Sequence, residues 1–391
     1  MYDFAFFDKP IDRRGTSCEK WDMLMEREGR ELLPMWVADM DFRCADEIVS
    51  ALQKRAAHPV YGYTEQSSEA VEALLGFLKR RHGLTLTAEQ QLLLPCVVTG
   101  LKAAVRAFTK PGDRVIVQSP VYGPFFLSTE LNGRVLADSP LKRGADGRYA
   151  MDFDGLETQC RAGARLMLLC NPHNPASRAW TKDELTRLWT LLKRYDVLLV
   201  SDEIHADFVY EQGGYTSCLN IATGANDRAI VLTSASKTFN IAGLQQAALL
   251  TRNQALKAAM NDEMNASGVT SGNIFALAAT EAAYRFGDAW LDGLLAYLRK
   301  GREILAEELT ARLPEAKLTP LEATYLGWID LRAYGMDNAA LMKRTHECGV
   351  AFTDGAFFGK EQGEGFLRIN IGCPHASVRE AVRRLEKAVK G

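Results

Sequence analysis

The sequence has no long uncharged apolar run. No window reaches the roughly 18 apolar residues that a membrane-spanning helix requires. The N-terminus has no basic residue ahead of its first apolar stretch, and Asp3 and Asp8 interrupt that stretch, so we identify no signal peptide. We therefore expect a cytoplasmic protein with no membrane partner.

The sequence also has no large net charge and no closely spaced pair of cysteines. The formal net charge is −2, so no overall field favours nucleic acid or an anionic membrane. Eight cysteines are scattered along the chain, without a C-x-x-C pair or the Cys/His spacing of a zinc site. This distribution is typical of reduced, mostly buried thiols and predicts no metal site.

The chain does have enough length and apolar content for a large core. With 391 residues and 47% hydrophobic residues, it should form two or three structural units. In the middle of the chain, short apolar runs alternate with helix-like segments. One helix should begin after Thr181 and end near Tyr195, because Thr181 and Glu184 form a capping-box pattern. The apolar runs are 115–118, 165–170, 197–200 and 229–233. This alternation predicts an α/β fold, in which helices cover both faces of a mostly parallel sheet.

The C-terminal part has a different pattern. A long amphipathic helix should run from Ala289 to about Leu313, and an α+β pattern follows it. That pattern comprises strand-like segments at 324–330 and 366–370 and helices at about 338–348 and 377–389. We predict three parts: an N-terminal segment (1–47) that packs with the small domain, a large ligand-binding domain (48–287), and a small C-terminal domain (288–391).

A lysine with neighbouring hydroxyls follows one of the apolar runs. Lys237 lies just after the run 229–233, with Ser234 and Ser236 close by. Parallel sheets bind ligands beyond the carboxyl ends of their strands. A lysine amine serves as a nucleophile when its pKa falls or when it is held as an imine, and serine hydroxyls can donate to a phosphate. A solvated loop lysine is the alternative interpretation of so short a motif.

An acidic residue follows the preceding run. Asp202 comes after 197–200, where its carboxylate could pair with a cationic ring nitrogen, as pyridoxal phosphate requires. The alternative is a helix cap. His205, three residues later, is interpreted as a buried or hydrogen-bonded histidine rather than as a direct catalyst.

Four further positions have residue types that suit a ligand. Asn174 offers a side-chain amide, and the small-residue turn within 97–104 opens a helix whose free N–H groups suit a phosphate. Tyr122 could stack on a planar cofactor. Arg368 lies in a short strand, where its guanidinium could bind a carboxylate through two parallel hydrogen bonds. Each of these positions alone is equally typical of a turn or of a structural salt bridge.

The order of these residues resembles that of fold-type-I pyridoxal-phosphate enzymes, which have the aspartate aminotransferase fold. The residues that share the order are Gly100, Tyr122, Asn174, Asp202, Ser234, Lys237 and Arg368. Asp202 and Lys237 are 35 residues apart (237 minus 202), as in that family. The segments 33–42, 61–63, 201–205, 236–240 and 368–374 look like the cystathionine β-lyase, or C–S lyase, branch of MalY/PatB type. The resemblance covers nearly the whole chain.

The resemblance implies a role for each residue around the cofactor ring. Lys237 would hold pyridoxal 5′-phosphate as a Schiff base, and Asp202 would pair with the ring nitrogen. Asn174 would bond the ring hydroxyl oxygen, and Tyr122 would stack on the ring. His205 would join the cofactor pocket at the place where many aminotransferases have a tyrosine.

The resemblance also implies how the phosphate is held. The backbone amides of Gly100 and Leu101 and the hydroxyl of Ser234 would bind it, with help from Ser236. Tyr61 would reach the phosphate of the partner subunit, so a homodimer with active sites at the interface is expected.

Two more positions concern the substrate. Arg368 would bind its carboxylate, assisted by backbone near Ala38. Many relatives have a glycine where this chain has Ser177, and that departure leaves the identity of the substrate open.

The function implied by the resemblance is β-elimination from an L-cysteine S-conjugate, with L-cystathionine as the type substrate. The products would be a thiol, pyruvate and ammonia. Lys237 would remove the Cα proton, and either Lys237 or Tyr122 would protonate the leaving sulfur. A class I/II aminotransferase is the alternative, and a lyase with an added regulatory protein-binding role is a further one. The sequence does not decide which sulfur amino acid is preferred.

Overall fold

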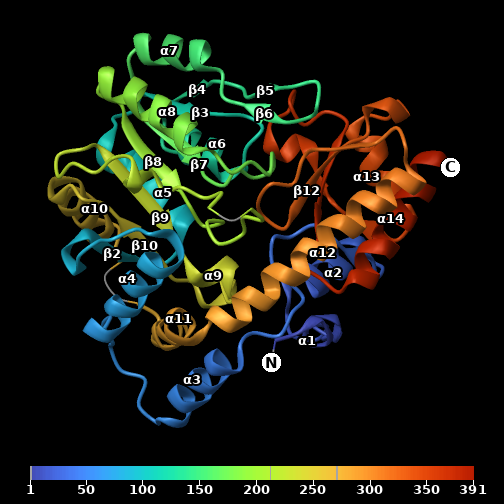
Figure 1. Cartoon of the computed structure of the whole chain (residues 1–391), viewed down its shortest axis with the longest axis horizontal. Helices are drawn as coiled ribbons and strands as arrows, with labels where there is room; N and C mark the ends of the chain where they lie inside the picture. The colour runs from blue at the N-terminus through green and yellow to red at the C-terminus, as the bar shows by residue number, and fades with distance from the viewer. Residues whose placement is uncertain (1, 212, 270–271) are drawn as a thin grey trace.

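The computed structural model describes residues 2–211, 213–269 and 272–391. Its largest feature is a seven-stranded sheet with the order β2-β10-β9-β8-β7-β3-β4 (Figure 1). The strands are β2 (Gln91–Leu94), β3 (Arg114–Val117), β4 (Val135–Asp138), β7 (Ala164–Cys170), β8 (Leu198–Asp202), β9 (Ala229–Thr233) and β10 (Ala247–Leu250). Among these strands, β10 pairs antiparallel with both of its neighbours. The predicted α/β class with a mostly parallel sheet is confirmed.

Helices cover both faces of this sheet. In β7, Leu166 and Leu168 pack into the core with α5, α6 and α10, whereas Met167 and Leu169 pack into the core with α4, α7, α8 and α11. The helices are α4 (Ser68–His82), α5 (Val97–Phe108), α6 (Pro124–Glu130), α7 (Phe153–Arg161), α8 (Lys182–Arg194), α10 (Gln254–Ala266) and α11 (Ile274–Phe286). Because alternate residues of a strand point to opposite faces, a strand covered on both sides is apolar throughout. The capping box at Thr181 and Glu184 opens α8 as predicted.

A second, four-stranded sheet has the order β11-β12-β15-β14. Its strands are β11 (Lys317–Leu318), β12 (Leu326–Asp330), β14 (Thr353–Asp354) and β15 (Phe366–Asn370). The helices of this part of the chain are α12 (Asp288–Arg312), α13 (Asn338–Glu347) and α14 (His375–Lys390). The predicted strand at 324–330 begins two residues late, because Thr324 has a left-handed backbone with φ 66°. The other predicted C-terminal elements agree with the structure to within two residues.

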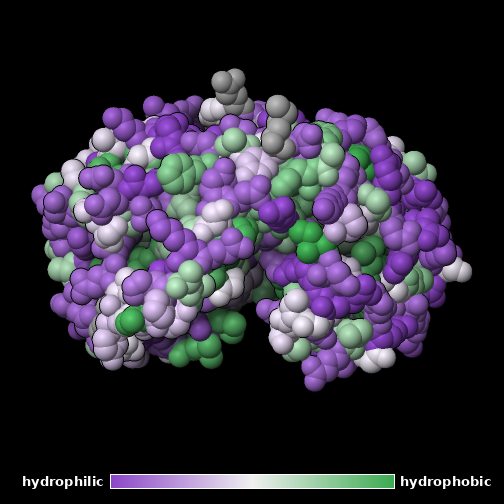
Figure 2. Space-filling view, turned by 90° about the horizontal axis from the view of Figure 1, so that it is seen from below, coloured by the Kyte–Doolittle hydropathy of each residue, from purple (hydrophilic) through white to green (hydrophobic). Residues whose placement is uncertain are grey.

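The N-terminal residues contact both the C-terminal part of the chain and α11, which covers the seven-stranded sheet. They form α1 (Phe4–Asp8), α2 (Leu24–Glu28) and α3 (Asp46–Ala57), and β1 (Leu33–Pro34) pairs in parallel with β13 (Val350–Ala351). The space-filling view shows a notch between two lobes of the molecule (Figure 2). The division into 1–47, 48–287 and 288–391 stays a prediction.

All eight cysteines are free, but only four of them are buried, so the prediction of mostly buried thiols holds for half of them. Within the described residues, no helix combines the length and hydropathy needed to cross a membrane.

Candidate active site

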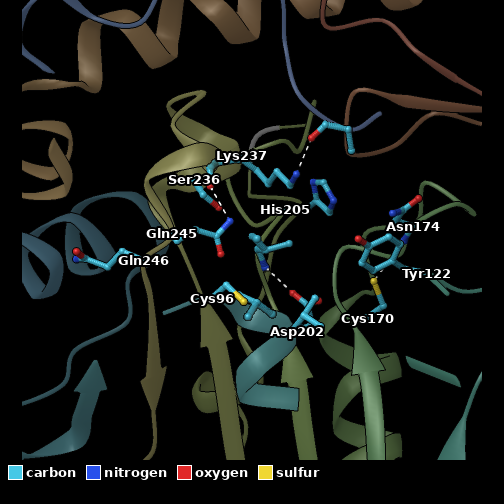
Figure 3. Close-up of a pocket in the computed structure, with 15 residues that line it drawn as sticks. Cys96, Tyr122, Cys170, Asn174, Asp202, His205, Ser236, Lys237, Gln245 and Gln246 are labelled. Carbon is cyan, nitrogen blue, oxygen red and sulfur yellow. Dashed lines mark hydrogen bonds between the residues drawn. The ribbon is translucent and has the colours of Figure 1, made fainter. Parts of the chain in front are cut away.

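The carboxyl ends of the central strands surround a cavity of about 210 Å³. Side chains reach it from β7, β8, the start of α5, the short helix α9 (Ala235–Thr238) and the segment near Ala38. Figure 3 shows Lys237 and Asp202 entering from opposite sides, with Tyr122 and Asn174 on a third. The lining residues are Ala38, Cys96, Val97, Val98, Tyr122, Cys170, Asn174, Asp202, Ile204, His205, Ser236, Lys237, Ala242, Gln245 and Gln246. The structure thus brings together residues that span more than half of the chain.

Lys237 lies in α9, directly after β9. Its Nζ donates to the carbonyl oxygen of Ala38 at 2.6 Å. Desolvation by the surrounding protein lowers the pKa of this amine, although the charge of Asp39 opposes the shift. A lysine with a lowered pKa is available as a nucleophile or base closer to neutral pH than a solvated lysine.

Asp202 is the last residue of β8 and is buried. One of its oxygens accepts the backbone N–H of Ile204 at 3.1 Å. Burial raises the pKa of this carboxyl to about 7, and the charge of the neighbouring Glu203 adds to the effect. A buried carboxyl of this kind gains most from a cationic partner, because that partner offsets the cost of its charged form.

His205 faces the same cavity and is neutral. Burial lowers its pKa to about 3, and the positive charges of Lys237 and Arg368 add to that effect. Its buried Nδ1 has no hydrogen-bond partner among the described residues. The ring packs edge-on against Tyr325, with 5.9 Å between centroids. A neutral imidazole with a free nitrogen can contact a planar ligand without adding charge.

Arg368 and Asn174 are linked beside the cavity. Arg368, in β15, donates from Nη1 to Oδ1 of Asn174 at 3.2 Å and from Nη2 to the carbonyl oxygen of Trp36 at 2.7 Å. Its buried Nε has no partner among the described residues, and burial lowers its pKa to about 10. Because Oδ1 of Asn174 already accepts from Arg368, the Asn174 amide is left to donate to a ligand oxygen.

Tyr122 is half-buried, and burial raises the pKa of its phenol. Its ring lies 5.8 Å from that of Phe357, at an interplanar angle of 60°. The Tyr122 ring therefore packs against Phe357, and the side chain also lines the cavity.

A family model described as "Aminotransferase class I and II" matches residues 32–385. The chain belongs to this family. Its fold and its cavity at the strand ends therefore agree with the predicted aspartate aminotransferase fold and with the ligand position expected for such sheets.

Full-length relatives indicate which branch of this family the chain resembles. The chain is 40% identical to cystathionine beta-lyase PatB of Bacillus subtilis (strain 168), over 98% of this chain and 99% of PatB. It is 34% identical to Protein MalY of Escherichia coli (strain K12), over 100% and 99%. A crystal structure of cystalysin from Treponema denticola, described as containing a pyridoxal 5′-phosphate cofactor, superposes with a TM-score of 0.94 at 32% identity, covering 98% of each chain. The predicted resemblance to the MalY/PatB branch is confirmed.

The amides predicted to bind the phosphate lie inside α5 rather than at its first residues. α5 begins at Val97, so the N–H of Gly100 already donates to the carbonyl oxygen of Cys96, and Leu101 lies further into the helix. The free N–H groups of the first turn belong to Val97 and Val98, which line the cavity. The Gly100 amide is therefore already bonded within the chain, and the phosphate-binding roles of Gly100 and Leu101 stay predictions. Gly100 instead permits close packing, because a Cβ there would lie 2.8 Å from a methyl of Leu94.

The roles of Ser236, Ser234 and Tyr61 in holding the phosphate stay predictions. Ser236 lines the cavity. The hydroxyl of Ser234 caps α9 by accepting the Ser236 N–H and donates to the carbonyl oxygen of Gln246 at 2.5 Å, so it would have to turn from Gln246 to reach a phosphate. Tyr61 is 57% exposed, outside the cavity, and donates to the carbonyl oxygen of Ala56.

Tyr325 is the main residue that the sequence did not reveal. Its hydroxyl donates at 3.0 Å to the carbonyl oxygen of Ala38, the same atom that accepts from Lys237. A tyrosine inside an apolar strand-like run is read as core, and no pattern in the sequence shows that its hydroxyl reaches the site.

Proposed function

We propose that this chain is a pyridoxal-phosphate-dependent carbon–sulfur β-lyase that cleaves L-cystathionine or related L-cysteine S-conjugates to a thiol, pyruvate and ammonia. The observation that carries the proposal is that the Lys237 amine and the buried Asp202 carboxyl line the same cavity from opposite sides (Figure 3). Full-length relatives named cystathionine beta-lyase support the reaction class.

The residues around the cavity fit pyridoxal phosphate. Asp202 has no cationic partner within ion-pairing distance in the described chain, and it would pair with the ring nitrogen. Lys237 would bind the cofactor covalently, and the amides of Val97 and Val98 would hold its phosphate at the positive end of α5. The unpaired Nδ1 of His205 would face the ring region. When bound, the cofactor supplies an electron sink that stabilises negative charge developing at Cα.

The chain's own residues account for substrate binding and proton transfer. Arg368 would hold the substrate carboxylate, and its Nε, which has no partner among the described residues, is available as an additional donor. Lys237 would take the Cα proton, since desolvation favours its neutral, basic form. The proton for the leaving sulfur would come from Lys237 or from the hydroxyl of Tyr122, both of which line the cavity.

A pair of assays tests the reaction class. The enzyme loaded with pyridoxal phosphate is incubated with L-cystathionine, and pyruvate and free thiol are measured together, beside Lys237→Ala. Equal amounts of pyruvate and thiol that disappear in the variant support the β-lyase. A keto acid formed only when an amino-acceptor keto acid is added would contradict it and would establish the aminotransferase alternative.

We also propose that the protein works as a cytoplasmic homodimer. The segment 58–67, between α3 and α4, has no helix or strand, and it exposes Val60, Tyr61 and Tyr63. Apolar side chains on an extended segment are typical of a protein interface. Light scattering on the purified protein should give twice the chain mass of 43.3 kDa, and a monomer mass would contradict the proposal.

The cytoplasmic location is supported by the cysteines, because free thiols at all eight of them suit a reducing compartment.

A further inference from the structure

The cavity around Lys237 continues into an outer cavity of about 630 Å³. Tyr122, Lys237, Ala242 and Gln245 line both, so the two spaces adjoin. The N-terminal segment forms much of the outer wall. A cysteine conjugate whose carboxylate and Cα occupy the inner cavity must extend the group beyond its sulfur into an adjoining space, and the outer cavity is such a space.

Most of the charges around the outer cavity neutralise one another. Arg13 donates to both oxygens of Asp39, at 2.9 and 2.8 Å, and to Asp41 at 2.9 Å. The buried Lys20 donates to Asp41 at 2.7 Å and to the carbonyl oxygen of Asp39 at 3.0 Å. Two cations and two carboxylates are thus held in one network, and Arg13 is not free to receive a ligand carboxylate.

Glu19 lines the same outer cavity and stands outside this network. It is exposed, and no cation among residues 2–211, 213–269 and 272–391 forms an ion pair with its carboxylate. The charge of Glu19 also acts on two residues that line the inner cavity. Desolvation lowers the pKa of Lys237, and the charge of Glu19 opposes that shift. Burial raises the pKa of Tyr122, and the charge of Glu19 adds to that shift. With the network neutral and the Lys237 amine taken up by the cofactor in the proposed enzyme, Glu19 is the charged side chain of the outer cavity that no ion pair compensates in the described part of the chain.

We propose that Glu19 makes the enzyme prefer L-cysteine S-conjugates with a cationic group beyond the sulfur and disfavour those with an anionic group there. The proposal rests on the β-lyase function and adds its substrate class. L-cystathionine has both an ammonium and a carboxylate group at its distal end, so it is neutral overall there and lies between the cationic and the anionic conjugates in this ranking. Because Glu19 is exposed, its ion pair with the substrate should be worth about two- to fivefold in kcat/KM.

Three substrates of similar size separate charge from bulk. S-(2-aminoethyl)-L-cysteine, S-propyl-L-cysteine and S-carboxymethyl-L-cysteine place a positive, a neutral and a negative group at comparable distances from the sulfur. The measurement is kcat/KM for pyruvate formation by enzyme saturated with pyridoxal phosphate. We expect the wild type to prefer the cationic over the neutral substrate by about two- to fivefold, and the neutral over the anionic by a similar factor.

Variants assign the preference to one side chain. In Glu19→Gln, the ratio between the cationic and the neutral substrate should approach one, and in Glu19→Lys the order should reverse. Glu26→Gln is the matched control, because Glu26 is an exposed acid in α2 that lines neither cavity. This control should keep the wild-type ratios. High salt should reduce the wild-type preference through screening.

The outcomes distinguish the two proposals. Turnover of all three substrates without a charge preference, or a preference that survives in Glu19→Gln, overturns the role of Glu19 and leaves the lyase function standing. No pyruvate from any of the three or from L-cystathionine overturns the lyase function and the selectivity with it.

Discussion

Burial sets the chemistry of the individual site residues. The carboxyl of Asp202 and the imidazole of His205 are shifted in opposite senses by the same cause, since a low-polarity environment favours the neutral form of each. Without a ligand, the cavity therefore disfavours the charged forms of these side chains. A ligand with a charge opposite to that of a lining side chain would stabilise that charged form.

Asp202 should make the stability of the cofactor-free protein depend on pH. Its folded pKa of about 7 lies above the ordinary 3.8, so its ionisation destabilises the fold progressively as pH rises from about 4 to 7. Asp202→Asn removes that ionisation. The melting temperature of the cofactor-free variant minus that of the cofactor-free wild type should therefore be larger at pH 8 than at pH 5. An equal difference at both pH values would contradict a raised pKa.

Tyr325 should act as a positioning residue for the Ala38 carbonyl. Tyr325→Phe removes one of the two donors to that oxygen and should lower the free energy of unfolding by about 1 kcal/mol, the usual net value of such a hydrogen bond. Urea unfolding of cofactor-free protein measures this change. Tyr334→Phe, at a tyrosine whose hydroxyl has no partner among the described residues, is the control and should change it less.

Some of the site residues could be predicted from the sequence more readily than others. Asp202, Lys237 and Arg368 follow or occupy strand-like runs, so their residue types and order were readable, although their roles stay proposals. The start of α5 was harder to predict, because Cys96 caps this helix and cysteine is not a residue that signals a helix start.

At the scale of elements, the turn after β7 shows how a serine fits where the family resemblance leads one to expect a glycine. Ser177 has a left-handed backbone with φ 55°, a conformation that glycine adopts without cost. Its hydroxyl contacts the carbonyl oxygens of Leu326, at 2.7 Å, and Pro175, at 3.1 Å. The serine therefore keeps the glycine-like turn and ties it to β12. The sequence could show the substitution but not this contact between segments 149 residues apart.

Two substitutions at Ser177 separate strain from hydrogen bonding. Ser177→Ala keeps the strained backbone and loses the hydroxyl, so it should lower the free energy of unfolding by about 1 kcal/mol. Ser177→Gly loses the same hydroxyl but relieves the strain, and should be about 1 kcal/mol more stable than Ser177→Ala. Thermal or urea unfolding measures both. A glycine variant less stable than the alanine variant would contradict the account.

At the scale of the molecule, the segment 36–42 joins the parts of the structure. It has little regular structure, and side chains from β15 and from the residues after α9 bind its carbonyl oxygens. Asn370, from β15, donates to Val37 and Asp39 at 2.6 and 2.7 Å, and Asn240, three residues after Lys237, donates to Met40 and Phe42 at 2.9 and 2.8 Å. Buried carbonyl groups need such partners. Sequence patterns predicted both sheets, but a segment held by side chains leaves no periodic signal.

Asn370→Ala should weaken this junction. It removes both bonds from a buried site and should lower the free energy of unfolding by about 2–4 kcal/mol, since two carbonyl groups lose a donor. It should also lower kcat/KM, because Ala38 lies between the two bound carbonyls. The control is Asn226→Ala, at an exposed asparagine, which should change neither quantity. Unchanged stability in Asn370→Ala would contradict the role of the segment.

The most direct test of the account is to locate the bond between protein and cofactor. The purified enzyme with pyridoxal phosphate is reduced with borohydride, which makes a lysine–cofactor bond permanent, and its peptides are analysed by mass spectrometry. We expect the cofactor's mass on the peptide containing Lys237, and no such label in Lys237→Ala. A label on another lysine, or an unlabelled wild type, would contradict the account.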